Sequence, residues 1–328
     1  MRLYVLFHRS FSPRYRIPQF MPYFRSRGIE ADLVRLNDYP IHRWKQFRKA
    51  RHYSVTVLQR RVLQPWDMAI LRHAAPHLVF DFDDAVMYRS SKRSSPFSRS
   101  RMFKFRKTVE PCDLVFAGNS FLKKETERFV SSQKVHVIPT VVDLEKYTPK
   151  EQTDCPDQVT VGWIGSGGTL GYLRGIMPAL ERLAKQSSSV RLKIVCDEFL
   201  ESREIPIIKK KWEERTEVED VKSFDVGVMP LSDDVWSKGK CALKILQCLA
   251  VGVPVVCSPV GANREIVRHG SNGFWATSHE EWIKSLLTLI ENPSLRRKMG
   301  MRGREVVAEG YSVQAVGDRI IDLIRSLV

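Results

Sequence analysis

The chain has 328 residues, 43% hydrophobic and 27% charged, which is the composition of a globular protein with room for two domains. No apolar run reaches the roughly 20 residues that a membrane-spanning helix needs, and the first residues lack a signal-peptide pattern, so we expect a cytoplasmic protein. Six cysteines without a CxxC pair argue against a zinc site or a disulfide framework and predict free, buried thiols.

The formal net charge of +16 is concentrated in the first half of the chain. Residues 1–150 contain 29 Lys and Arg against 13 Asp and Glu, whereas residues 151–328 contain 24 of each class. Arginine-rich stretches at 43–51 and 91–107 carry much of the excess. Such a field attracts an anionic partner, which is a membrane surface, a phosphorylated glycolipid or nucleic acid; a merely solvated basic face is the alternative.

Strands and helices alternate through the first 140 residues. Apolar runs predict buried strands at 2–8, 31–36, 53–59, 77–82, 113–118 and 135–140. Helices are expected between them at 18–28, 42–51, 65–75, 101–110 and 120–130, with a Ser- and Arg-rich loop at 90–101. Strands separated by helical stretches of roughly 10–15 residues indicate βαβ units and a parallel sheet.

A polar stretch with two prolines at 143–158 predicts a linker, after which the pattern restarts. Strands are expected at 159–165, 190–196, 225–231 and 253–258, and helices at 170–185, 240–250, 279–291, 294–309 and 311–328. The fold class predicted from this order is α/β, with two Rossmann-like, doubly wound parallel-sheet domains at residues 1–148 and 149–310.

The stretch at 238–261 is organised as helix, turn and strand. Its apolar residues recur on a helical period over 240–250, Gly252 ends the helix, and Pro254 begins a short buried strand. Three lysines stand at the expected helix start: Lys238, Lys240 and Lys244. Because the N–H groups of a first helical turn attract anions, these lysines indicate a phosphate site, unless they form only a solvated cluster.

Further polar features of the second half follow strand ends or interrupt an apolar face. Gly165, Ser166 and Gly167 form a glycine-rich turn whose N–H groups suit a phosphate, although a plain tight turn explains them equally well. Gln247 needs a partner among apolar neighbours, either a ribose hydroxyl or a core group. Asp197 follows another strand, either to meet a base or ribose or as part of a solvated loop.

In the first half, Asp81, Asp83 and Asp84 end a strand. Carboxylates so close repel one another, so arginines, helix N–H groups or a metal must compensate them. They suit a general base or an acceptor of sugar hydroxyl groups, and a helix cap is the alternative. Arg14 and Arg16 follow the first strand, toward the same sheet edge, and guanidinium groups suit a phosphate or carboxylate.

These motifs together resemble a family. The segments FDVGVMPL, KCALKILQCLAVGVPVVCSPVGANREIV and HGSNGF are similar to retaining nucleotide-sugar glycosyltransferases of the GT-B fold, the glycogen-synthase-like group 1 of family-four type. In the first half, AGNSFL and VIPTVVDLEKYTP resemble the segment that leads into that family's interdomain linker. SPRYRIPQF, VLQRR and DFDDA resemble the bacterial branch that acts on cell-surface glycans.

The resemblance implies two Rossmann-like domains that face each other across a cleft. The N-terminal domain would bind the acceptor and the C-terminal domain the nucleotide sugar, and the last helix, 311–328, would pack back on the first domain. The family needs no metal, because N–H groups and basic side chains meet the diphosphate charge. We therefore expect no cofactor and no metal site, and a UDP- or GDP-sugar as co-substrate.

Family positions carry over to this chain with several departures: the two family glutamates, the basic residue after the glycine-rich turn, the first-domain glycine loop and the catalytic histidine have no direct counterpart. The glutamate that touches the donor sugar falls on Gly239, and the glutamate that holds ribose falls on Gln247. The donor-binding residues implied are Gly165, Ser166, Gly167, Lys240, Ala242, Leu243, Lys244 and Gln247. The catalytic residues implied are Asp83, Asp84 and Lys240, and those for the acceptor are Arg14 and Arg16.

The predicted function is transfer of a sugar, with retained anomeric configuration, from a nucleotide diphosphate sugar to a glycolipid, lipopolysaccharide or surface-polysaccharide acceptor. The basic N-terminal domain would contact the inner membrane face from the cytoplasm. One alternative is a nucleotide- or sugar-binding protein of the same fold with weakened catalysis, motivated by Gly239 and Gln247. Another is a basic nucleic-acid-binding protein, for which no recognition motif is present.

Overall fold

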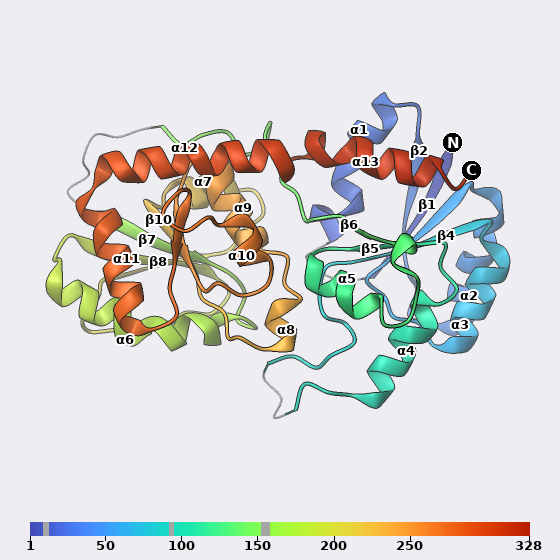
Figure 1. Cartoon of the computed structure of the whole chain (residues 1–328), viewed down its shortest axis with the longest axis horizontal. Helices are drawn as coiled ribbons and strands as arrows, with labels where there is room; N and C mark the ends of the chain where they lie inside the picture. The colour runs from blue at the N-terminus through green and yellow to red at the C-terminus, as the bar shows by residue number, and fades with distance from the viewer. Residues whose placement is uncertain (9–12, 92–94, 152–157) are drawn as a thin grey trace. The chain divides into compact units, whose positions relative to one another are not determined.

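The structure is a computed structural model that describes residues 1–8, 13–91, 95–151 and 158–328 (Figure 1). Parts of three predicted segments therefore lie outside the described residues: the loop after the first strand, the basic stretch 91–107 and the linker with Cys155. The chain divides into two compact units. Unit 1 comprises Met1–Val141, Asp234–Cys241 and Val313–Val328, and unit 2 comprises Val142–Asp233 and Ala242–Ser312.

Unit 1 is built on a six-stranded sheet in the order β2-β1-β3-β4-β5-β6, in which every neighbouring pair is parallel. The strands are β1 (Arg2–Phe7), β2 (Glu30–Arg35), β3 (Val55–Gln59), β4 (His77–Phe82), β5 (Leu114–Ala117) and β6 (Val135–Val137). The apolar runs of β3 and β5 are completely buried, as a parallel sheet covered on both faces requires.

Helices cover both faces of this sheet. On one face α2 (Pro40–Lys49), α3 (Pro65–Ala74) and α4 (Arg99–Val109) contact one another in turn (Figure 1). α5 (Ser120–Thr126) packs beside β5 and β6 on this same face, where Leu122 joins the core formed with α2, α3 and α4. On the other face α1 (Met21–Ser26) contacts α13 (Val313–Arg325). The apolar stripe of α13 joins the core of unit 1 through Val313, Val316, Ile320, Ile321 and Ile324.

Unit 2 contains a second parallel sheet in the order β12-β11-β10-β7-β8-β9. Its strands are β7 (Val159–Ile164), β8 (Val190–Cys196), β9 (Ile207–Lys211), β10 (Val226–Met229), β11 (Val255–Cys257) and β12 (Gly273–Trp275). Its helices are α6 (Leu170–Gln186), α7 (Glu217–Lys222), α9 (Leu243–Ala250), α10 (Ala262–Ile266), α11 (His279–Glu291) and α12 (Pro293–Gly310). The predicted α/β class with two doubly wound parallel sheets is confirmed.

The border between the units differs from a simple division of the sequence at residue 148. Unit 2 already begins at Val142, whose backbone pairs with that of Ser312, and Tyr147 lies in the unit 2 core. The segment 234–241, with the short helix α8 (Val235–Lys238), belongs to unit 1 although its neighbours in sequence belong to unit 2. The expected linker thus contributes the buried side chain of Tyr147 to a folded unit.

The structure bears on two further predictions, which concern the cysteines and membrane-spanning helices. The five cysteines among the described residues are free and buried, as predicted for them. No helix of the described residues is both long and apolar enough to cross a membrane.

Candidate functional site

The carboxyl edge of the unit 1 sheet collects most of the polar residues predicted in the first half. β3, β4 and β5 end at this edge, where ligands of open α/β sheets bind. They are followed there by Arg60, by Asp83 and Asp84, and by Asn119.

Arg16 lies in the core below this edge and pairs with Asp81. Its guanidinium group donates to both carboxylate oxygens of Asp81, at 3.3 Å from Nε, and at 2.7 Å to the carbonyl of Ile138. Gln59 donates a further hydrogen bond of 3.3 Å to the same carboxylate. Because Arg16 is only 3% exposed, its charge is compensated inside the protein.

Arg14, the second arginine assigned to the acceptor, is partly exposed. Its guanidinium group lies over the ring of Tyr15, 4.6 Å from the centroid, and donates a 2.8 Å hydrogen bond to the Tyr15 hydroxyl. The two arginines therefore have different surroundings, since Arg16 pairs with Asp81 in the core and Arg14 lies against the ring of Tyr15.

Arg60 is the cation that compensates the two remaining carboxylates. It forms an ion pair with Asp84, and its Nε lies 3.8 Å from Oδ1 of Asp83. Burial raises the pKa of Asp84, while the charges of Arg60 and Lys240 act in the opposite direction. Arg60 has a left-handed backbone (φ 60°), which is uncommon for a residue with a side chain and occurs often at functional sites.

Asn119 fastens the segment 234–241 to this edge. Its side-chain Nδ2 donates hydrogen bonds of 3.0 Å to the carbonyls of Lys238 and Lys240, while its Oδ1 accepts from the N–H of Leu122 and caps α5. The thiol of Cys241 donates to the carbonyl of Asp83 at 3.2 Å. Lys240 is thereby held in unit 1, near Asp84.

Sequence reasoning did not select Asn119 or Arg60 as site residues. The N-cap role of Asn119 was readable, because an asparagine precedes an apolar helical stretch there. Its contacts with carbonyls more than a hundred residues further along the chain had no local signal.

The helix expected at 240–250 begins at Leu243, which corrects its predicted start. Ala242 occupies the N-cap in a left-handed conformation (φ 53°) and has no side chain that could cap the helix. Lys238 ends α8 and Lys240 lies between the helices, so of the three lysines Lys244 alone stands in the first turn of α9. Leu243 and Lys244 still occupy the first helical positions, whose N–H groups lack intrahelical partners.

The glycine-rich turn follows β7, at the carboxyl edge of the unit 2 sheet. The N–H of Gly167 donates a 2.7 Å hydrogen bond to the carboxylate of Asp197, and that of Ser166 donates to Oγ1 of Thr169 at 3.2 Å. The hydrogen bond from the N–H of Gly167 lowers the pKa of Asp197. A carboxylate therefore already occupies one amide of the turn, which shows that the amide is oriented to receive an anion.

Gln247 is fully buried in a polar network behind α9. Its Nε2 donates to the hydroxyl of Tyr147 at 2.6 Å, and that hydroxyl donates to Glu217 at 2.7 Å. Glu217 also accepts from the indole N–H of Trp212 at 2.9 Å and lies 4.0 Å from Nζ of Lys244. This is the arrangement that the core-glutamine alternative predicts.

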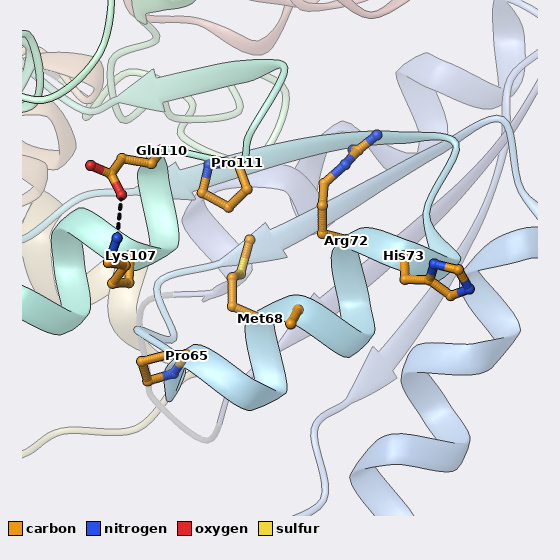
Figure 2. Close-up of a pocket in the computed structure, with 8 residues that line it drawn as sticks. Pro65, Met68, Arg72, His73, Lys107, Glu110 and Pro111 are labelled. Carbon is orange, nitrogen blue, oxygen red and sulfur yellow. Dashed lines mark hydrogen bonds and ion pairs between the residues drawn. The ribbon is translucent and has the colours of Figure 1, made fainter.

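A cavity of about 550 Å³ lies between α3 and α4 in unit 1 (Figure 2). It is lined by Pro65, Met68, Ala69, Arg72, His73, Lys107, Glu110 and Pro111. Lys107 and Glu110 form an ion pair of 3.0 Å at its border. None of the predicted site residues lines it, so the candidate site is defined by the sheet edges.

One family model matches a segment of the second half of the chain. Residues 160–292 match the family model described as "Glycosyl transferases group 1", which confirms the resemblance for this segment. A trehalose synthase from Pyrococcus horikoshii is 25% identical over 85 residues, which are 26% of this chain. The match spans 20% of that relative's length.

Solved glycosyltransferases share the fold of the whole chain. Sucrose-phosphate synthase from Thermosynechococcus elongatus is 16% identical, with a TM-score of 0.75 and coverage of 100% of this chain and 99% of the other. HepE from Anabaena, in complex with UDP and glucose, is 14% identical, with a TM-score of 0.74 and coverage of 99% and 100%. The lipopolysaccharide outer core galactosyltransferase WaaB is 12% identical, with a TM-score of 0.67 and coverage of 100% for both chains. These likenesses establish the GT-B fold.

Proposed function

We propose that this chain, in which residues 160–292 form a group 1 glycosyl transferase domain, transfers a sugar from a nucleotide diphosphate sugar to a surface-glycan acceptor. The observation that carries this is the start of α9, where Ala242 leaves the first N–H groups without a side-chain cap. Such a helix start binds a phosphate through oriented N–H groups.

The donor diphosphate would be held by unit 2. The N–H groups of Leu243 and Lys244 face the position that the helix dipole favours for an anion, and Lys244 adds its charge. The turn Gly165–Ser166–Gly167 lies at the same sheet edge, and there a donor phosphate would take the place of the Asp197 carboxylate as acceptor of the Gly167 N–H. Stabilising the leaving diphosphate in this way offsets the main negative charge that develops in the transition state. HepE, solved with UDP-glucose, makes UDP the first nucleotide to test.

The acceptor would be bound by unit 1, at the edge with Arg60, Asp83 and Asp84. A carboxylate held at this edge can accept a hydrogen bond from a sugar hydroxyl, and the raised pKa of Asp84 suits a group that exchanges protons. Lys240, fixed beside Asp84 through Asn119, is the cation we assign to catalysis. Retention of configuration, a glycolipid or lipopolysaccharide acceptor and contact with the inner membrane face complete the proposal.

Binding and turnover of UDP-, GDP-, ADP- and dTDP-sugars test the proposal. Lys244→Ala should weaken nucleotide binding about tenfold, because one charge-assisted contact with the diphosphate is lost. Lys284→Ala, an exposed lysine on α11, is the matched control and should bind like the wild type. Binding of no nucleotide by the intact chain, or equal binding by both variants, would contradict the assignment.

A binding protein without turnover is the second candidate, favoured by Gly239. A Cβ on this residue would lie 2.5 Å from Cβ of Ala85, so the position of the first family glutamate has no room for a side chain. Nucleotide binding without transfer to any glycan acceptor, and without donor hydrolysis, would support this candidate. Measurable hydrolysis that Lys240→Ala abolishes would reject it.

A further inference from the structure

Five large apolar side chains of unit 1 are more than half exposed and gather at the starts of three helices. They belong to α2, α3 and α4 or to the residues just before them: Tyr39, Ile41, Trp66, Phe97 and Phe103. Removing an apolar side chain from water is favourable. The exposure of all five side chains at helix starts therefore requires an explanation.

The topology of unit 1 places these helix starts on one edge. Helices that connect parallel strands run opposite to them, so each helix begins at the carboxyl edge of the sheet. α2, α3 and α4 each follow a strand of the same parallel sheet, and α3 contacts both other helices. The three starts therefore form a row, at the edge where Arg60, Asp83 and Asp84 also lie.

α4 extends beyond the start of α3. Lys107, near the end of α4, and Pro65, at the start of α3, line the same cavity (Figure 2). The first two turns of α4 therefore extend past the start of α3, and they carry Phe103. Phe97 precedes α4 and packs edge-on against Tyr88, with ring centroids 5.7 Å apart.

Basic side chains surround the apolar ones on the same helices. Arg99, Arg101 and Lys104 lie in the first two turns of α4, and Lys45 lies on α2. Arg101 also donates to the carbonyl of Tyr88 at 3.1 Å, which ties the charged turn to the support of Phe97. Of the acidic residues nearby, Asp67 is paired with Arg43 at 2.8 Å, and Asp38 is exposed.

We propose that this helix-start rim, consisting of Tyr39, Ile41, Trp66, Phe97, Phe103 and the basic residues of α4, is a docking surface for an anionic lipid bilayer. Aromatic and aliphatic side chains would enter the headgroup boundary, and Arg99, Arg101 and Lys104 would meet lipid phosphates. The proposal rests on the proposed function, because it presents the acceptor edge of unit 1 to the membrane that carries a glycolipid. A single-stranded nucleic acid would require a series of aromatic side chains on which successive bases stack. The exposed side chains instead lie on three separate helix starts and include the aliphatic Ile41, which favours a bilayer as the partner.

Vesicle co-sedimentation of the full chain tests this docking. Binding is expected to vesicles of mixed phosphatidylcholine and phosphatidylglycerol, to weaken as salt rises, and to be absent for phosphatidylcholine alone. Phe97→Ser with Phe103→Ser should reduce binding at least about tenfold, because two inserting side chains are lost. Arg99→Gln with Lys104→Gln should reduce it by a similar factor, through loss of two charges.

The matched control is a variant with exposed residues of unit 2 changed, Met301→Ser with Arg203→Gln, which should bind vesicles like the wild type. UDP binding, which we assign to unit 2, should persist in both rim variants, and an unchanged circular dichroism spectrum and thermal unfolding midpoint would show that unit 1 is also folded. Equal vesicle binding by the rim variants, or tighter binding to a single-stranded oligonucleotide than to anionic vesicles, would overturn the proposal. Vesicle binding that depends on the rim, without any sugar transfer, would instead refute the proposed enzyme while leaving the docking surface standing.

Discussion

Gly239 and Ala85 approach each other more closely than any side chain at position 239 would permit. A Cβ on Gly239 would lie 2.5 Å from Cβ and 2.7 Å from the backbone nitrogen of Ala85, whereas real contacts stay beyond about 3 Å. The glycine is therefore required by the packing of the segment 234–241 on the end of β4. The same packing leaves no room for the glutamate that the sequence resemblance places at this position.

Gly239→Ala should lower the free energy of unfolding by about 1–3 kcal/mol, because the new methyl group forces the backbone segments apart. Gly175→Ala is the matched control, since nothing lies within 4 Å of a Cβ at that position in α6. There alanine should be neutral or stabilise by up to about 1 kcal/mol through its helix propensity. Urea denaturation of both variants measures the contrast, and equal effects would contradict the packing argument.

Asn119 has two separable roles, in the cap of α5 and in the anchoring of residues 234–241. Asn119→Ala removes both and should cost about 2–3 kcal/mol, from one cap and two hydrogen bonds. Asn119→Asp keeps an oxygen for the cap but loses the donor to both carbonyls.

Hydrogen exchange distinguishes the two roles of Asn119. Residues 234–241 should exchange faster in both variants, whereas α5 should exchange faster only in Asn119→Ala. An unchanged exchange rate at 234–241 in Asn119→Asp would show that the two carbonyl contacts do not hold the segment.

Gln247→Glu would restore the residue type of the family but place a carboxyl group in a buried site. The Tyr147 hydroxyl has one proton, which it already donates to Glu217, so the new carboxylate would lack a donor there. Burial would raise the pKa of this carboxyl group in the folded chain above its unfolded value of about 4.3. Ionisation of this carboxyl group therefore costs no stability below a pH of about 4.3, and the loss in the free energy of unfolding grows as the pH rises toward the folded pKa.

Urea denaturation at pH 5 and pH 8 measures this effect. Gln247→Glu should be destabilised by about 2 kcal/mol or more at pH 8 and by less at pH 5. Gln314→Glu, at an exposed position in the first turn of α13, is the control and should show little change with pH. A pH-independent loss in Gln247→Glu would mean that the carboxylate finds another donor.

Ala242 carries a left-handed backbone that glycine adopts without strain. Ala242→Gly should be neutral or stabilise the chain by up to about 1 kcal/mol, because the clash of Cβ with the backbone is removed. The same substitution at exposed Ala308 in α12 should cost about 1 kcal/mol, as in any helix interior. The thermal unfolding midpoint should stay unchanged or rise in Ala242→Gly and fall in Ala308→Gly. A fall in both variants would mean that the backbone at Ala242 is not strained.

Most strands that were predicted from the sequence are largely buried, and the clearest exception is the edge strand β2. β3, β7 and β8 stand out as apolar runs because neighbours cover both sides of them. β9 was missed because this edge strand has the sequence IIKKK. Its three consecutive lysines do not show the alternation of apolar and polar residues that is typical of a strand. β12 was missed because its sequence GFW contains no β-branched residue, unlike the equally short VHV of β6 and VVC of β11.

The sequence predicted only those features of the candidate site that depend on residues close together in the chain. Asp83 and Asp84 at a strand end were predictable, and so was the need for a compensating cation. That cation is Arg60, which follows the neighbouring strand in the sheet, and strand order decides this pairing. The partner of Gln247 is likewise a tyrosine a hundred residues away, which no spacing rule indicates.

The place of α13 in the core of unit 1 has a consequence for how this protein is made. Its residues Val316, Ile320 and Ile324 pack with Leu3, Val5 and other side chains from the start of the chain. During synthesis, the face of the first sheet that α13 covers stays open until residues 313–325 leave the ribosome, whereas unit 2 has all its segments earlier. The half of the sequence translated first is thus the half that matures last, and its exposed sheet face is where a chaperone would be expected to act.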